Sequence, residues 1–168
     1  MFASPSGVSS KGWLFLAGGV VLVLVGIGGF FAVFVEAHVD SLGQVRIKRV
    51  VGVYDVGRMV NPRLARSQLM GGITFGIGMA LMEATVPDEK VGRVLNPNLA
   101  EYHVPVCADI PEFDLDFIDE PDPQMSDLGV RGIGEIGIVG APAAIGNAIF
   151  HATGKRVRDL PITPDKLI

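Results

Sequence analysis

An alternation of apolar and polar residues constrains the fold of this chain more than any other pattern. From residue 31 the odd-numbered residues are apolar, and polar side chains occupy even positions from residue 36. A two-residue period is typical of a half-buried β-strand. Turn-forming residues follow at 40–43, and the alternation resumes from residue 44 to residue 53. The pattern predicts a β-hairpin over residues 31–53.

Helical patterns flank a further strand in the rest of the chain. Asn61 and Pro62 suit the N-cap and first position of a helix, which we place at 62–83. A second helix is expected at 138–153, before the C-capping Gly154. Apolar and acidic residues alternate at 113–118, as in an edge strand with a solvated acidic face. We therefore expect an α+β fold, with antiparallel strands packed by two main helices.

The helix at 62–83 contains two features with more than one interpretation. Gly72 and Gly76 match a membrane Gly-x-x-x-Gly contact, but the apolar stretch is short, which favours close packing of a buried helix. Gln68 stands at the border between charged first turns and an apolar body. A buried amide must find hydrogen-bond partners. The partner is either the protein backbone or a polar group of a cofactor lying over the helix.

Residues 1–29 differ from the remainder, and we treat them separately from a unit at 30–168. The segment 13–29 is apolar or glycine throughout, and as a helix it would reach about 26 Å, which is marginal for a bilayer. It is interpreted as an uncleaved membrane anchor, a signal-like segment or a non-native leader. The sequence does not separate a cytoplasmic from a periplasmic location.

Composition excludes several classes of protein and of site. A net charge of −4 argues against a nucleic-acid binder, which would present a basic face. The single cysteine, Cys107, excludes an internal disulfide and any multi-cysteine zinc or iron–sulfur site. The histidines at 38, 103 and 151 lack ligand-like spacing, so no protein metal ligand is expected.

A glycine-rich segment, Gly132–Gly137, carries one charged residue, Glu135, and precedes an apolar helical run. It fits a dinucleotide-binding turn, a tight loop that holds a catalytic base, or a loop with an incidental solvated glutamate. The preceding residues 126–131 are polar and interrupted by Gly129. A buried strand should precede a dinucleotide turn, so these flanks argue against the first interpretation.

Four segments together resemble the C-terminal cofactor domain of the molybdenum hydroxylases, the family of xanthine dehydrogenases and aldehyde oxidases. They are the Asp55-x-Gly57-x-x-x-Asn61-Pro62 element, Gln68 to Gly72, the glycine-rich segment and the tail at 151–164. The resemblance covers about residues 30–168. The glycine-rich segment alone is weak evidence, but its combination with the other three is specific.

The resemblance implies roles for three positions. Glu135 matches the general base, which takes a proton from a hydroxyl or water ligand of molybdenum. Gln68 matches a glutamine that hydrogen-bonds the pterin, and Gly134 would bring backbone close to the metal centre. A carboxylate with an unperturbed pKa of about 4.3 becomes an effective base near neutral pH only when burial raises that value. We therefore expect the glutamate to be shielded from water and to face the same hollow as Gln68.

The resemblance also implies cofactors and partners. The cofactor would be molybdenum-molybdopterin, in simple or dinucleotide form, with iron–sulfur clusters and FAD on partner subunits only. The family's catalytic subunit is several times longer, and its upstream Gly-Gln-Gly element is missing, because Gly43-Gln44 is followed by Val45. We expect a C-terminal fragment that relies on upstream domains and on iron–sulfur, FAD or cytochrome subunits, and whose enzyme hydroxylates small aldehydes or N-heterocycles. The alternative is a small membrane-anchored binding or structural protein that uses residues 13–29 as its anchor.

Overall fold

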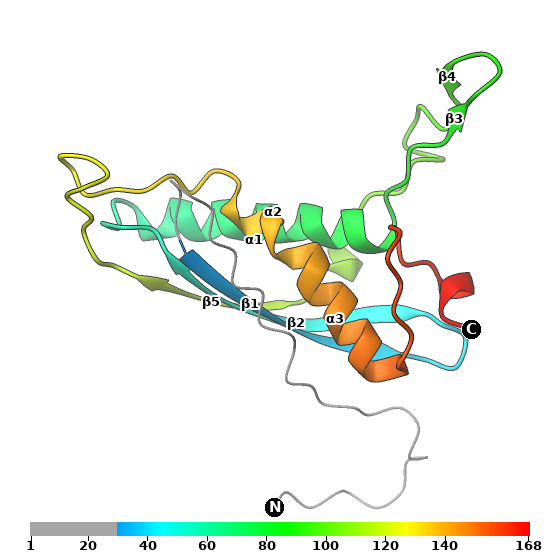
Figure 1. Ribbon diagram of the computed structural model, residues 1–168, viewed down its shortest axis with the longest axis horizontal. Helices are drawn as coiled ribbons and strands as arrows, with labels where there is room; N and C mark the ends of the chain where they lie inside the picture. The colour runs from blue at the N-terminus through cyan, green and yellow to red at the C-terminus, as the bar shows by residue number, and fades with distance from the viewer. Residues whose placement is uncertain (1–29) are drawn as a thin grey trace, which may run out of the picture.

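The computed structural model describes residues 30–168, which fold around a three-stranded sheet (Figure 1). Strands β1 (Phe30–Val39) and β2 (Val45–Asp55) form the antiparallel hairpin that the alternation predicts. Strand β5 (Glu112–Ile118) lies on the other side of β2. The anchor, signal or leader interpretations of residues 1–29 fall outside the described residues.

Side-chain chemistry holds the turn between β1 and β2. Oδ1 of Asp40 accepts hydrogen bonds from the amides of Leu42 at 2.8 Å and Gln44 at 2.9 Å. Gly43 has a φ of +77°, a conformation that glycine adopts at little cost. A Cβ at this glycine would lie 2.6 Å from the carbonyl oxygen of Pro164, so the turn also packs against the C-terminal tail.

Strand β2 contains one residue more than the part of β1 with which it pairs. Glu36 pairs with Arg49 and Ala37 pairs with Ile47, which leaves Lys48 without a partner in the register. This β-bulge changes which residues of β2 face the core. The core-facing residues are Ile47 before the bulge, and Val50, Gly52 and Tyr54 after it.

Strand β5 corrects one expectation, because it pairs with β2 in parallel and not antiparallel. Its edge position and its bounds agree with the predicted strand at 113–118. Alternation defines the two faces of a strand but carries no information on its direction. The direction follows from the connection, since residues 56–111 include a helix that carries the chain back along the sheet before β5 begins.

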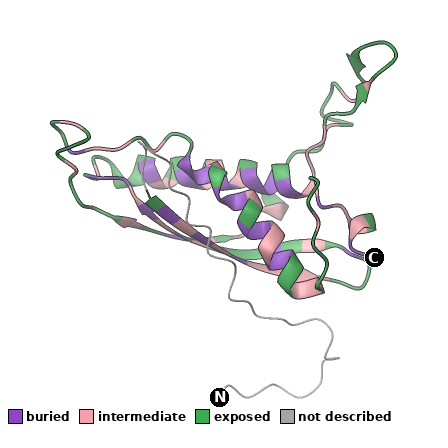
Figure 2. Cartoon of the chain, viewed as in Figure 1, coloured by how far each residue is buried: buried purple, intermediate pink, exposed green. Residues whose placement is uncertain are grey.

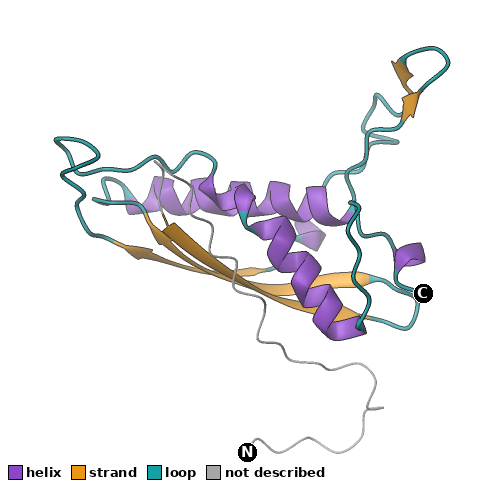
Figure 3. Cartoon of the chain, in the orientation of Figure 1, coloured by secondary structure: helices purple, strands orange, loops and turns teal. Residues whose placement is uncertain are grey.

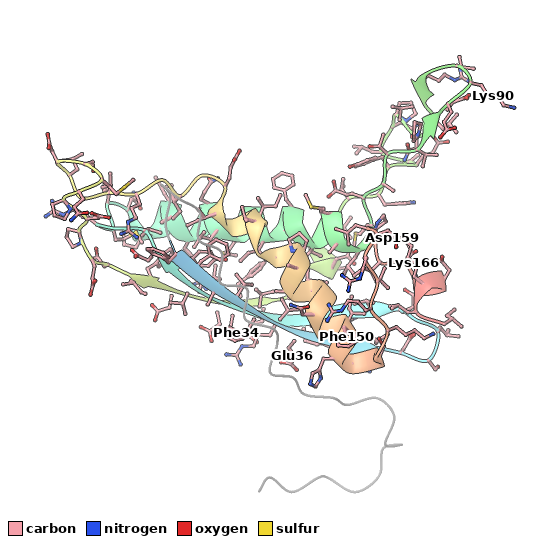
Figure 4. The ribbon with its side chains drawn as sticks, viewed as in Figure 1. Phe34, Glu36, Lys90, Phe150, Asp159 and Lys166 are labelled. Atoms are coloured by element: carbon pink, nitrogen blue, oxygen red, sulfur yellow. The ribbon has the colours of Figure 1, made fainter. Side chains whose placement is uncertain are left out.

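The two main helices lie on one face of the sheet (Figure 3). Helix α1 spans Pro62–Leu81 and α3 spans Ala141–Thr153, in agreement with the predicted helices. The core lies between these helices and the sheet (Figure 2). On the opposite face of β1, Phe34 and Glu36 point away from the helices (Figure 4). The architecture is α+β, as the sequence indicates.

The second helical run begins earlier than predicted and is interrupted. A short helix, α2 (Ile136–Val139), precedes α3, and Gly140 separates the two. This glycine packs on the sheet, because a Cβ at its position would lie 2.6 Å from the ring of Phe31. The close approach anchors the start of α3 to β1.

Helix α1 packs closely against α2 and α3 through its small residues. A Cβ on Gly72 would lie 2.9 Å from the amide nitrogen of Ile138 and 3.0 Å from the carbonyl carbon of Gly137. One turn later, a Cβ on Gly76 would lie 2.5 Å from the Cβ of Ala141. The two glycines therefore serve packing between buried elements, which is the interpretation the sequence favours.

By length and composition alone, one helical run among residues 30–168 could cross a membrane, and it is Ile136–Thr153. The run is interrupted at Gly140, and 44% of it is buried inside the protein. Its apolar residues Ala144, Ile145 and Ile149 belong to the core. Packing against the sheet and α1 accounts for their apolar character.

An arm and a tail complete the fold. The arm, residues 84–104, projects from the end of α1 and contains the short strands β3 (Pro87–Asp88) and β4 (Arg93–Val94), with Lys90 near its tip (Figures 1 and 4). The tail follows α3, and its Ile162 amide donates to the carbonyl oxygen of Ala80 at 2.7 Å. This hydrogen bond joins the tail to the C-terminal end of α1.

Alanine at two adjacent glycines of α1 tests the packing of this helix. Alanine favours a helix over glycine by roughly 1 kcal/mol. We expect Gly71→Ala to stabilise the protein by about that amount, because nothing lies within 4 Å of its Cβ position. Gly72→Ala should destabilise it by about 1–3 kcal/mol, because its methyl group would overlap the backbone of α2. Thermal unfolding of both variants measures the contrast, and equal shifts would contradict this account of the packing.

The hydroxyl of Tyr54 is a buried polar group without a hydrogen-bond partner among the described residues. Its ring stacks on that of Phe31, with centroids 5.7 Å apart, and burial raises the pKa of Tyr54 well above its usual value. An unsatisfied buried hydroxyl costs free energy of desolvation. We expect Tyr54→Phe to raise the free energy of unfolding by about 1 kcal/mol, as measured by chemical denaturation. A marked loss of stability would reveal a partner for the hydroxyl.

Candidate functional site

A cavity of about 390 Å³ opens at the N-terminal end of α1. Its walls come from the segment after β2, the first turns of α1 and the segment that leads into α2, which meet at one end of the sheet (Figure 3). The lining residues are mainly apolar, with a few polar groups: Val56, Arg58, Met59, Val60, Asn61, Leu64, Ala65, Gln68, Val130, Arg131, Ile133 and Gly134.

The segment after β2 is shaped by residues of the Asp-x-Gly-x-x-x-Asn-Pro element. Oδ1 of Asp55 accepts the amide hydrogen of Gly57 at 3.1 Å. Gly57 has a φ of +67° and forms an isolated antiparallel bridge with Val130. A side chain at this glycine would collide with the carbonyl oxygen of Gly129. The aspartate and glycine therefore let this segment pair with the chain that precedes the glycine-rich segment.

The end of the same element starts α1. Asn61 is the N-cap, and its Oδ1 accepts the amide hydrogen of Leu64 at 3.1 Å. Pro62 occupies the first helical position, where its missing N–H has no cost. This start places Gln68 two turns into the helix, on the wall of the cavity.

Gln68 is brought next to the glycine-rich segment, 66 positions away in sequence. Its Nε2 donates a hydrogen bond to the carbonyl oxygen of Gly134 at 2.7 Å. The amide is exposed, which contradicts the expectation that it is buried. Its partner is protein backbone, one of the two alternatives left open by the sequence. Within the described part of the chain its Oε1 has no partner, and that oxygen remains available as an acceptor.

Glu135 lies immediately after Gly134 at the start of α2, but it is exposed. The expectation that apolar neighbours shield this carboxylate is therefore wrong for residues 30–168. The reason is geometric, because Ile136 turns into the core, where it is 6% exposed, and leaves the preceding side chain outside. The carboxylate of Glu135 forms no capping hydrogen bond to α2, and the residue does not line the cavity itself.

Neither steric crowding nor backbone conformation within residues 30–168 requires glycine at two positions of the segment. Neither Gly132 nor Gly134 has a positive φ, and no atom lies within 4 Å of the Cβ position of either residue. Gly137, by contrast, packs on α1, where a Cβ would lie 2.9 Å from the carbonyl oxygen of Leu69. The first two glycines therefore keep the backbone open on the side that faces away from the fold.

An arginine that the sequence analysis did not single out holds the cavity wall together. Nη1 of Arg131 pairs with Oδ2 of Asp55 at 2.6 Å, and Nη2 pairs with Oδ2 of Asp122 at 2.6 Å. All three side chains are less than 20% exposed. The arginine stands directly before the glycine-rich segment, but its partners lie 76 and 9 positions away, which no local pattern reveals.

The acidic face predicted for the strand at 113–118 is exposed at Asp114 and Asp116, but carboxylates of the acidic segment that follows, residues 119–122, bind the cavity wall. Asp119 accepts the amide hydrogen of Met59 on the cavity wall at 2.8 Å, and Asp122 binds Arg131. On β5, Asp114 pairs with Arg49 at 2.6 Å, in an exposed position. Within residues 30–168, no three His, Cys, Asp or Glu side chains are grouped as a set of metal ligands.

The model of the molybdopterin cofactor-binding domain matches residues 27–111, about half of the sequence. The chain belongs to this family. The match includes the Asp-x-Gly-x-x-x-Asn-Pro element and all of α1, so Gln68 lies inside it. The other residues of the cavity wall, from Val130 onward, lie beyond the matched range.

Relatives of this molybdopterin domain are molybdenum-binding subunits. The chain is 48% identical over 136 residues to the aldehyde oxidoreductase molybdenum-binding subunit PaoC of Escherichia coli K12, covering 80% of the chain and 19% of that subunit. It is 42% identical over 139 residues to the putative xanthine dehydrogenase molybdenum-binding subunit XdhA of the same organism, covering 82% and 18%. The chain thus spans about a fifth of the length of these relatives.

A solved structure supports the fold of the molybdopterin domain. Quinoline 2-oxidoreductase from Pseudomonas putida 86 superposes with a TM-score of 0.74 at 30% sequence identity. The superposition covers 82% of this chain and 18% of the other. The α+β arrangement of this chain therefore occurs inside a much longer oxidoreductase chain.

The residues of the cavity fit a pterin cofactor. The open backbone at Gly134, which lines the cavity, leaves space for a group to approach without a side chain in between. Gln68 offers an unpaired acceptor oxygen on the same rim. Arg58 also lines the cavity, and its guanidinium has no partner among the described residues. Polar donors and acceptors on an apolar wall are typical of a cofactor site.

The pairing with Arg131 predicts how the cavity wall responds to acid. Hydrogen bonds from Arg131 hold the pKa of Asp122 below its usual range. A depressed pKa means that the ionised carboxylate stabilises the fold above about pH 4, and that this stabilisation is lost as the pH falls through the lowered value. We expect an NMR titration followed at the carboxyl carbon of Asp122 to have its midpoint below pH 3.9. In Arg131→Gln the midpoint should move to higher pH. A normal midpoint in the unmodified protein would contradict the ion pair.

Proposed function

We propose that this chain forms the cofactor-binding part of an oxidoreductase subunit that hydroxylates aldehydes or N-heterocycles at molybdenum, with Glu135 as general base. Family membership and the names of the relatives support the cofactor and the reaction class. The observation that carries the proposal is the hydrogen bond from Gln68 to Gly134. It joins Gln68 and Gly134, which both line the cavity, and Glu135 follows Gly134 directly in the chain.

Each residue of the rim has a distinct task in this proposal. Gln68 holds the glycine-rich segment through its Nε2 and offers Oε1 to the pterin. Gly134 leaves the backbone open to the cofactor, and Arg58 supplies positive charge for its phosphate. The molybdenum–pterin group, when bound, supplies the two-electron oxidation. Glu135 accepts the proton released as the substrate carbon is hydroxylated, which is general-base catalysis.

A base of this kind requires shielding that residues 30–168 do not provide. We propose that other parts of a longer subunit cover Glu135, since the chain spans about a fifth of the length of its relatives. Helix α1 suits such a cover, because Leu64 at the cavity and Phe75 about three turns further along the helix are 67% and 65% exposed. Large exposed apolar side chains commonly mark an interface. Iron–sulfur and flavin groups belong, in this proposal, to partner subunits.

Substitution of Glu135 tests the proposal. Residues 30–168 replace the corresponding segment of a related aldehyde-oxidising subunit, and aldehyde oxidation is measured together with molybdenum content. We expect Glu135→Gln to lower kcat by roughly 10²–10⁴, the usual contribution of a positioned base, without loss of molybdenum. Gln68→Ala should lower the molybdenum content instead, because the pterin loses a partner.

The control for this experiment is Glu112→Gln, which changes an exposed glutamate at the start of β5. It should keep full activity and full molybdenum content. The general-base assignment fails if Glu135→Gln also keeps full activity. The cofactor assignment fails if the assembly that contains residues 30–168 is folded but binds no molybdenum.

A further inference from the structure

The glycine-rich segment has few contacts that could define its conformation. No side chain of the fold packs at the Cβ positions of Gly132 and Gly134, and between them only Ile133 packs against the core. Beyond Glu135, the chain is fixed by Gly137, which packs on α1. Within residues 132–135, Ile133 packs against the core, and the Gly134 carbonyl oxygen accepts the hydrogen bond from Gln68. Neither contact fixes the direction from which the chain enters residue 132.

Arg131 fixes this direction. Its amide donates to the carbonyl oxygen of Val56 at 3.0 Å, and its guanidinium binds Asp55 and Asp122. Its guanidinium carbon also lies 5.5 Å from the centroid of the Phe30 ring, within the range of a cation–π contact. Backbone, carboxylate and aromatic contacts thus hold one residue in place from three separate segments.

Both carboxylates are also held by backbone amides of their own segments. Oδ1 of Asp55 accepts the amide hydrogen of Gly57, and Oδ1 of Asp122 accepts that of Gln124 at 3.0 Å. In each case the other oxygen, Oδ2, is left for the guanidinium. The amide of Asp122 also donates to Gly129 at 3.0 Å, so the acidic segment is tied to the chain that leads to Arg131.

We propose that Arg131 is a positioning residue for the reaction, because its two ion pairs set the path of residues 132–135. That path places the Gly134 carbonyl against Gln68 and leaves Glu135 at the rim of the cavity. The inference rests on the proposed function for the use of this rim. The geometry requires a planar fork, since two carboxylates on different segments are bound through separate nitrogens. Lysine at this position keeps the charge but offers a single nitrogen, so it cannot reproduce the separate contacts that Nη1, Nη2 and Nε make.

The test compares three variants of the 168-residue chain by NMR. Arg131→Lys keeps the charge and removes the fork. Asp122→Asn weakens one ion pair and leaves the pairing of Arg131 with Asp55. This milder variant keeps the inference testable if Arg131→Lys does not fold. Asp114→Asn is the matched control, because Asp114 pairs with Arg49 at the same 2.6 Å but in an exposed position.

Two local signals report on the path of the segment. The amides of Arg131 and Ile138 are hydrogen-bonded at either side of it, to Val56 and to Glu135. We expect Arg131→Lys and Asp122→Asn to accelerate their hydrogen exchange at least tenfold and to shift the side-chain amide protons of Gln68. Exchange in α3 should stay unchanged, and the control variant should resemble the unmodified protein.

Two outcomes overturn the inference. Unchanged exchange and an unchanged Gln68 signal mean that Arg131 does not set the path. Uniform acceleration that includes α3 means that it only stabilises the fold. These signals need no molybdenum, so they separate this inference from the proposed function. If Glu135→Gln keeps its activity while the local signals change as expected, the proposed function fails and the positioning of the segment stands.

Discussion

Contact between two glycines, Gly72 of α1 and Gly137 of α2, determines where the candidate site can form. Without side chains at either residue, the backbones of the two elements approach to van der Waals distance. Gln68 stands one turn before the first glycine and Gly134 stands three residues before the second. The close approach therefore brings an amide side chain to a carbonyl oxygen from a remote part of the sequence. Steric fit, and not charge, sets this register.

Charge adds to packing at the other end of the cavity, where three short irregular segments meet. They are the segment after β2, which contributes Val56 to the core, the residues around Asp122 and the chain before residue 132. Arg131 joins them, and because its partners are protected from bulk solvent, the pairing is less screened than an exposed ion pair such as Arg49 with Asp114. One wall is held by packing and the other by electrostatics.

Much of the fold follows from local sequence patterns. Alternation gives the hairpin, Asn61 and Pro62 give the start of α1, and Gly154 gives the end of α3. The direction of β5 does not follow, because a single strand has the same pattern in both orientations. The interruption at Gly140 is also hidden, since it depends on the ring of Phe31 on a strand more than 100 positions away.

The resemblance supplied three candidate residues, but not their environment and not the arginine that stands beside them. Residues 68, 134 and 135 follow from the resemblance, and the structure brings them together. Their exposure was not foreseen, because apolar neighbours in sequence do not imply apolar neighbours in space. Ile136 shows this, since it is buried while the residue before it is not. Arg131 was missed because its role depends on two carboxylates whose pairing exists only in the folded chain.

The unpaired Lys48 separates the hairpin into two mechanically distinct parts. In an unbroken strand, gain or loss of one residue rotates every later side chain to the opposite face. Here the gain or loss of one residue near the turn can be compensated at the β-bulge, where the pairing of β1 with β2 is already interrupted, if the bulge is lost or enlarged. Val50, Tyr54 and the aspartate that closes β2 can keep their orientation. The end of the sheet that supports the cavity is thereby insulated from variation at the opposite tip.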